Sequence, residues 1–224
     1  MNFMSFPLTS ISKKQIVALT GLLLILFIIV HLIGNLLIFG GADLFNGYVE
    51  FLDHLRPGTT TAEFILAGIF ITHITFTAML VYVNIKARGG YKRYAVDKSV
   101  GDRSWATRLM PLSGAYIFFF LIWHIFDFTL ARDDGPRSFI AGKSLGLYGV
   151  VINSFKDPLH SILYIIAVCF VGLHLAHGVQ SVIQTWGVDR SKFARPLILG
   201  SRIFGFIIAF GFSSLPIYVM FFLR

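Results

Sequence analysis

The stretch IVALTGLLLILFIIVHLIGNLLIFG, residues 16–40, decides the fold class of this chain. It contains no Asp, Glu, Lys or Arg, and it is longer than the about 20 apolar residues that an α-helix needs to cross a bilayer. Similar stretches lie near residues 63–86, 108–130, 158–185 and 197–222. The chain is 56% hydrophobic and 13% charged, with a mean hydropathy of +0.76. The sequence therefore predicts an all-α membrane protein, one membrane domain over residues 1–224 with five transmembrane helices.

Basic residues set the predicted orientation. Lys13 and Lys14 precede the first span, and the connections 87–107 and 186–196 carry more Lys and Arg than the connections 41–62 and 131–157. The positive-inside rule then places the N-terminus in the cytoplasm. Because topology accounts for the net charge of +8, no nucleic acid partner is predicted. The first span is too long for the apolar region of a signal peptide, so it is interpreted as a retained helix.

The two outer connections, residues 41–62 and 131–157, are long. Cys169 is the single cysteine, which excludes an internal disulfide and an iron–sulfur cluster on this chain. Residues 145–155 are compatible with an interfacial helix on the outer side. The sequence shows no separate soluble domain, so any chemistry on a water-soluble substrate is expected on another subunit.

Four histidines lie deep inside four different spans: His31, His73, His124 and His174. A histidine inside a membrane span indicates a functional site. With a rise of 1.5 Å per residue, His31 and His124 lie roughly 22–24 Å from the inner edge, and His73 and His174 roughly 18–20 Å. Depth therefore pairs His31 with His124 and His73 with His174, and two bis-histidine sites suggest two haem groups.

Other interpretations of these histidines remain. A single buried histidine often bonds a backbone carbonyl, and histidines also form proton relays, usually with buried carboxylates. Zinc and copper are less favoured because each depth offers only two strong ligands. His177 competes with His174, although its depth fits His73 less well. Arg108, Thr20 and Ser181, with Lys14 and Gln184, are candidate partners for haem propionates near the inner end.

The chain resembles a known family over nearly its whole length. The resemblance lies in Leu19-Thr20-Gly21, His31-Leu32, Gly41–Asn46, Phe51–Asp53, His73, Trp123–Asp127, His174–Gly178 and Thr185-Trp186-Gly187. The chain thus resembles the cytochrome b subunit of succinate dehydrogenase and fumarate reductase, of the single-subunit, five-helix, dihaem type.

The resemblance implies a function and a set of partners. Such a subunit anchors a flavoprotein and an iron–sulfur protein on the cytoplasmic face of a bacterial or archaeal membrane. It passes electrons between the iron–sulfur subunit and a membrane quinone, menaquinone or another, through two haems b. His73 and His174 would hold the proximal haem, and His31 and His124 the distal one. Alignment on Trp186-Gly187 favours His174 over His177. The succinate and fumarate chemistry would take place on a partner subunit.

Quinone chemistry requires a group that exchanges protons with water. Asp127 lies three residues after His124, inside the third span, and Asp53 and Glu63 flank the outer ends of the first two spans. These three acids are the candidate quinone and proton residues, with a bond from Asp127 to the backbone or Arg132 as the structural alternative. Two other functions stay open: a dihaem cytochrome b that anchors another oxidoreductase, such as a hydrogenase, and a haem-free transporter. The direction of turnover also stays open.

Overall fold

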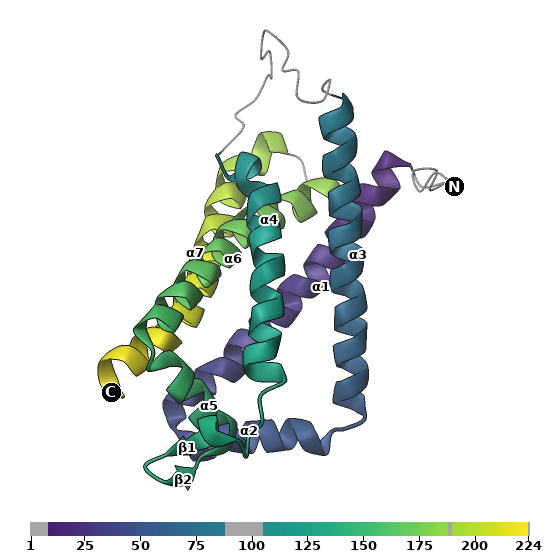
Figure 1. The fold of residues 1–224 in the computed structure, drawn as a ribbon. Coiled ribbons are helices and arrows are strands. Elements are labelled where there is room, and N and C mark those ends of the chain that lie inside the picture. Colours follow the sequence, from purple (N-terminus) through teal and green to yellow (C-terminus); the bar gives the residue numbers. More distant parts are fainter. Residues whose placement is uncertain (1–8, 88–104, 188–189, 224) are drawn as a thin grey trace.

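The structure is a computed structural model that describes residues 9–87, 105–187 and 190–223 (Figure 1). Five helices in these ranges are long and apolar enough to cross a membrane, which confirms the predicted fold class. They are α1 (Ser10–Leu36), α3 (Gly58–Ala87), α4 (Trp105–His124), α6 (Pro158–Thr185) and α7 (Arg190–Phe222). The chain is therefore a multi-pass helical membrane protein.

Four of these helices, α1, α3, α4 and α7, begin earlier than the predicted spans, and α6 begins where predicted. Thr9 caps α1, because its hydroxyl accepts a hydrogen bond from the Ser12 amide at 3.1 Å, so α1 begins at Ser10 rather than near residue 16. Helix α3 begins at Gly58, ahead of residue 63. At α6, the Asp157 carboxylate accepts from the Leu159 amide at 2.9 Å, so α6 begins at Pro158.

The spanning helices form a bundle in which α1, α4 and α7 run in one direction and α3 and α6 in the other (Figure 1). Helix α6 packs closely on α7 and also contacts α4 and α1. At the α6–α7 crossing, a Cβ built on Gly172 would lie 2.5 Å from the carbonyl oxygen of Gly205. Glycine thus permits a close backbone approach, as is common between membrane helices. Helix α3 packs mainly on α1 and contains no buried residue.

The end of the bundle that holds the C-terminus is closed by smaller elements (Figure 1). They are the turn η1 (Leu37–Gly40), α2 (Ala42–His54), the turn η3 (Pro136–Ser138), the strands β1 (Phe139–Ile140) and β2 (Lys143–Ser144), and α5 (Gly146–Phe155). No helix is predicted for residues 41–62 from the sequence, yet α2 forms there. The Asn46 side chain joins α2 to α5, donating to the Leu145 carbonyl at 2.8 Å and accepting from the Tyr148 amide at 3.1 Å.

Helix α5 differs from the interfacial helix expected for residues 145–155. Six of its ten residues are buried, and Val151, Ile152 and Phe155 belong to the same apolar core as Phe45 of α2 and Val219 of α7. The segment therefore packs beneath the bundle and seals this end of it.

Candidate cofactor site

His31 of α1 and His124 of α4 face each other in the half of the bundle that is closed by α5. Their ring centroids lie 5.8 Å apart and the ring planes are perpendicular, at 90°. Phe27 and Phe212 pack on the His31 ring. The Nδ1 atom of His124 is buried and has no hydrogen-bond partner among the described residues. The structure thus brings two imidazoles from different helices to one point.

His73 of α3 packs against Thr20 and Gly21 of the neighbouring helix α1. Its Nδ1 atom lies 3.0 Å from the Thr20 hydroxyl oxygen. A Cβ built on Gly21 would lie 3.3 Å from Cε1 of His73, so glycine leaves room for the ring against the backbone of α1.

His174 of α6 has the same kind of environment on α4. Its Nδ1 atom lies 3.0 Å from the Ser113 hydroxyl oxygen, and a Cβ built on Gly114 would lie 3.5 Å from its Cε1 atom. His177, three residues further along α6, is half-buried and has no recorded hydrogen bond within the described part of the chain. Only one of the two competing histidines is therefore held by a hydroxyl group.

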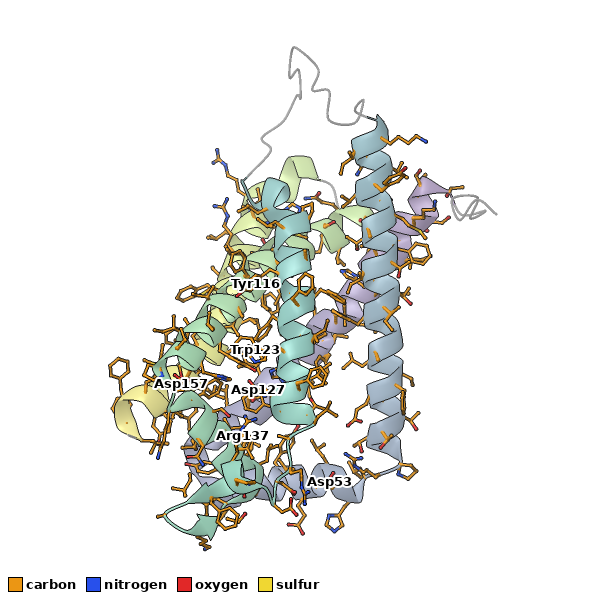
Figure 2. All side chains as sticks on the ribbon, viewed as in Figure 1. Asp53, Tyr116, Trp123, Asp127, Arg137 and Asp157 are labelled. Atoms are coloured by element: carbon orange, nitrogen blue, oxygen red, sulfur yellow. The ribbon has the colours of Figure 1, made fainter. Side chains whose placement is uncertain are left out.

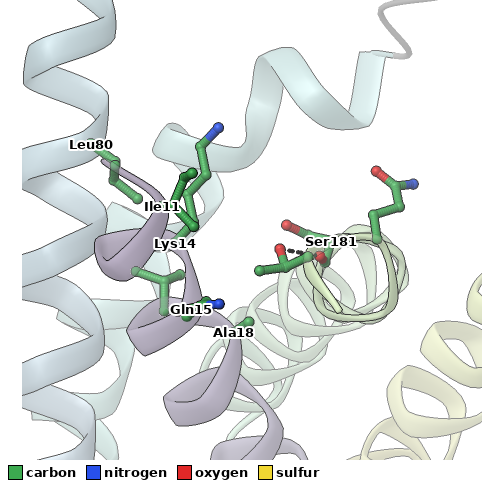
Figure 3. A pocket seen from close by; sticks show the side chains of 9 residues that line it. Ile11, Lys14, Gln15, Ala18, Leu80 and Ser181 are labelled. Atoms are coloured by element: carbon green, nitrogen blue, oxygen red, sulfur yellow. Dashed lines mark hydrogen bonds between the residues drawn. The ribbon is translucent and has the colours of Figure 1, made fainter. Parts of the chain in front are cut away.

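Three of the five residues predicted to meet haem propionates lie together: Lys14, Ser181 and Gln184. Thr20 contacts His73 rather than the inner end of the bundle. Ser181 lines a cavity of about 480 Å³ between α1, α3 and α6, together with Lys14, Gln15, Leu80 and Gln184 (Figure 3). The side chain of Arg108 lies outside the described residues. Lys14 thus places a cation in the same cavity as Ser181 and Gln184.

Asp127 lies between α4 and α6, close to the end of the bundle that α5 closes (Figure 2). Its carboxylate accepts hydrogen bonds from the Tyr164 hydroxyl at 2.8 Å and from the Arg137 guanidinium at 3.2 Å. Nε2 of His160 lies 3.1 Å from the same carboxylate, in a geometry that makes no hydrogen bond. The Asp127 side chain is 12% exposed, so this polar cluster is largely enclosed.

The other acids predicted for this region lie elsewhere. Arg132, the partner considered for Asp127, pairs with Asp134 on the surface. Asp53 pairs with Arg56 on the exposed side of α2 (Figure 2). Glu63 is exposed on α3. Neither Asp53 nor Glu63 is among the recorded partners of Asp127 in the described residues.

Four residues of these sites are not predicted from the sequence: Ser113, Arg137, His160 and Tyr164. A signal for Ser113 exists, because Ser113-Gly114 precedes His124 by the same number of residues as Thr20-Gly21 precedes His31. The other three residues are distant from Asp127 in sequence, and the folded structure brings them next to it. A π-helical turn, η2 (Ile125–Thr129), carries Asp127 directly after His124, and such turns are frequent at functional sites.

A comparison with known proteins agrees with these features. The chain is similar to a succinate dehydrogenase cytochrome b subunit. The relative, named succinate dehydrogenase cytochrome b558 subunit, comes from Bacillus subtilis (strain 168) and is 24% identical over 163 residues, which is 73% of each chain. This similarity supports the family that the chain resembles in sequence. No family model matches the chain, and no solved structure matches it.

Proposed function

We propose that this chain is the membrane anchor and electron-transfer subunit of a succinate:quinone oxidoreductase, acting as a succinate dehydrogenase or fumarate reductase. It would pass electrons between an iron–sulfur subunit and a membrane quinone through two haems b. The observation that carries the proposal is the arrangement of four intramembrane histidines on two pairs of helices. The named relative supports the same family. The similarity also favours this complex over a hydrogenase or formate dehydrogenase as the partner assembly.

The His31–His124 pair fits an axial pair of haem ligands. Histidine–metal bonds are about 2 Å long, so two rings on opposite sides of one iron have centres roughly 6 Å apart. The observed separation is 5.8 Å. Two imidazoles suffice here because a porphyrin supplies the remaining nitrogen ligands, and bound haem b then supplies a one-electron carrier. The aromatic side chains of Phe27 and Phe212 provide an apolar environment on the His31 side.

The second pair is His73 with His174. Each ring has one nitrogen bonded to a hydroxyl group, which is the arrangement expected of a metal-ligating histidine. Lys14 and Ser181, in the cavity at the inner end of the bundle, are proposed to meet a propionate of this haem. Lys14 would supply the positive charge and Ser181 a hydroxyl donor.

The proposed partners follow from the orientation. A flavoprotein and an iron–sulfur subunit would bind on the cytoplasmic face, where the N-terminus and the basic connections lie. Residues 88–104, which make up most of one basic connection, lie outside the described ranges, as do the side chains of 190–194. The membrane would be the cytoplasmic membrane of a bacterium or archaeon.

Quinone would react near the end of the bundle closed by α5, with Asp127 as the proton-exchanging group. Tyr164 connects Asp127 with His124, the proposed ligand of the distal haem. The Tyr164 hydroxyl donates to the Asp127 carboxylate, and the ring centroid of Tyr164 lies 6.2 Å from that of His124. Asp53 and Glu63 would serve as surface acids beyond it. Electrons that enter from the cytoplasm and reach this end would move negative charge outward, and a membrane potential that is negative inside favours this movement by roughly 2.3 kcal/mol per charge per 100 mV.

The test is to purify the chain with its soluble partner subunits and measure haem per chain, reduced-minus-oxidised absorption and succinate:quinone activity. We expect two low-spin haems b per chain and activity with a membrane quinone. A haem content near one or zero, in a sample that retains all subunits, would contradict the proposal.

A further inference from the structure

Helices α1 and α4 carry the same short pattern. Each has a hydroxyl residue followed by glycine, and each has a histidine ten residues after that glycine: Thr20-Gly21 with His31, and Ser113-Gly114 with His124. In both helices the hydroxyl–glycine pair receives a histidine from a neighbouring helix that runs in the opposite direction. We call each hydroxyl–glycine pair a seat.

The hydrogen bonds of the Thr20 seat fix which atom donates. The Thr20 hydroxyl oxygen lies 2.7 Å from the carbonyl oxygen of Ile16. Two oxygens at that distance require a proton between them, so the hydroxyl donates to the carbonyl. The same oxygen can then only accept from His73, and Nδ1 of His73 must carry the proton. Nε2 of His73 keeps its lone pair.

The hydroxyl of the Ser113 seat also donates to a backbone carbonyl and accepts from a histidine. The Ser113 hydroxyl donates to the Met110 carbonyl oxygen at 3.1 Å, so it accepts from Nδ1 of His174. Both hydroxyl residues are buried, which strengthens these bonds because water does not compete for them. The two glycines keep the backbone clear of each ring.

We propose that the two seats are positioning devices that hold His73 and His174 in the Nδ1-protonated tautomer and so make Nε2 of each ring the iron ligand. This inference rests on the proposed function and extends it to residues that contact no iron. A hydrogen bond at Nδ1 increases the electron donation of a ligating imidazole, which favours the ferric state. His177 has no such seat among the described residues, which gives a physical reason for His174 as the ligand.

The experiment uses the assembled complex and two variants that remove a hydroxyl: Thr20→Val, which keeps the branched shape, and Ser113→Ala. The haem bound by His73 and His174 is identified as the one lost in a His73→Ala complex. Its midpoint potential is then measured by redox titration of the haem absorption, with low-temperature electron paramagnetic resonance of the ferric signal. We expect the reduced-to-oxidised ratio at fixed potential to rise about two- to tenfold in each variant, where tenfold equals 59 mV for one electron.

Two further variants separate the seat from a general loss of packing. Thr20→Ser retains the hydroxyl and should restore the potential of the native complex. Ser214→Ala removes a hydroxyl of α7 whose one recorded hydrogen bond in the described part of the chain goes to the Gly211 carbonyl, and it should leave both potentials unchanged. If Thr20→Val loses the haem altogether while Thr20→Ser retains it, the seat is also supported.

Unchanged potentials in Thr20→Val and Ser113→Ala, or an equal shift in Ser214→Ala, would overturn the inference and leave the proposed function intact. A native complex without two haems would instead contradict the proposed function, and the inference with it.

Discussion

Replacing Tyr164 by Phe tests the enclosed cluster around Asp127 by removing a single oxygen atom. Tyr164 is 4% exposed, and its hydroxyl donates to the Asp127 carboxylate at 2.8 Å. The ring packs on His160 and Trp123, with centroid distances of 4.7 Å and 4.9 Å. Because phenylalanine keeps these ring contacts, the substitution isolates the hydrogen bond.

The expected cost follows from the nature of this bond. A hydrogen bond to a charged group contributes about 1.5–3 kcal/mol. Solvent screening reduces it little, since the Asp127 side chain is only 12% exposed. The ion pair with Arg137 is a smaller contribution, because the Arg137 side chain is 45% exposed. We therefore expect Tyr164→Phe to lower the free energy of unfolding by about 1.5–3 kcal/mol.

The assay is equilibrium unfolding of the purified protein in detergent, followed by tryptophan fluorescence. Tyr116→Phe is the matched control, because Tyr116 lies in a spanning helix and packs on Phe170, but its hydroxyl has no recorded hydrogen bond in the described residues. The control should change stability by less than about 0.5 kcal/mol. Equal effects of the two substitutions would show that the Asp127 cluster is not held together as the structure indicates.

Three further predictions concern other parts of the bundle. His174→Ala should reduce the haem content from two per chain to one, and His177→Ala should leave it at two; loss of haem only in the His177 variant would reverse the ligand assignment. Gly172→Ala should lower the unfolding free energy by about 1–3 kcal/mol through its clash with α7, whereas Gly178→Ala, which meets no atom within 4 Å, should be nearly neutral; equal costs would argue against a tight crossing. Asp127→Asn should slow quinone turnover about tenfold or more and, during quinol oxidation coupled to fumarate reduction, reduce proton release on the outer side of oriented liposomes; full turnover would exclude Asp127 as the proton-exchanging group.

The long helices could be predicted from the sequence because each combines length with low charge, and both properties are local. The closure of one end of the bundle was harder to foresee. Helix α2 is short and amphipathic. Helix α5 has the apolar composition of an interfacial helix, and its burial depends on its contacts with α2 and α7, which are distant in sequence. A Cβ on Gly149 would clash with the Ser138 carbonyl, and this close approach arises only when the chain from η3 folds back over α5.

The candidate site also has one part that the sequence predicts and one part that it does not. The depth of His31 and His124 is set by helix rise, and the structure brings these two rings together. Their role as iron ligands stays a prediction. The partners of Asp127 are 10 and 37 residues away along the chain, so no local pattern points to them. The expected neighbours Asp53 and Glu63 are near in sequence to the outer ends of the spans, yet helix α2 turns Asp53 toward solvent.

The spacing inside α1 and α4 explains how two helices serve both sites. Eleven residues separate Thr20 from His31, and Ser113 from His124. Three turns of an α-helix contain about 10.8 residues, so the hydroxyl and the histidine of each helix lie on the same face. That face holds a neighbour's ring at one level and offers its own imidazole about 16 Å further along the helix axis. The step is roughly half the thickness of the about 30 Å hydrocarbon core. A pair of helices with this period would therefore build the two proposed sites from one repeated pattern, and a change of one residue in either spacing would turn His31 or His124 by about 100° away from the bundle interior.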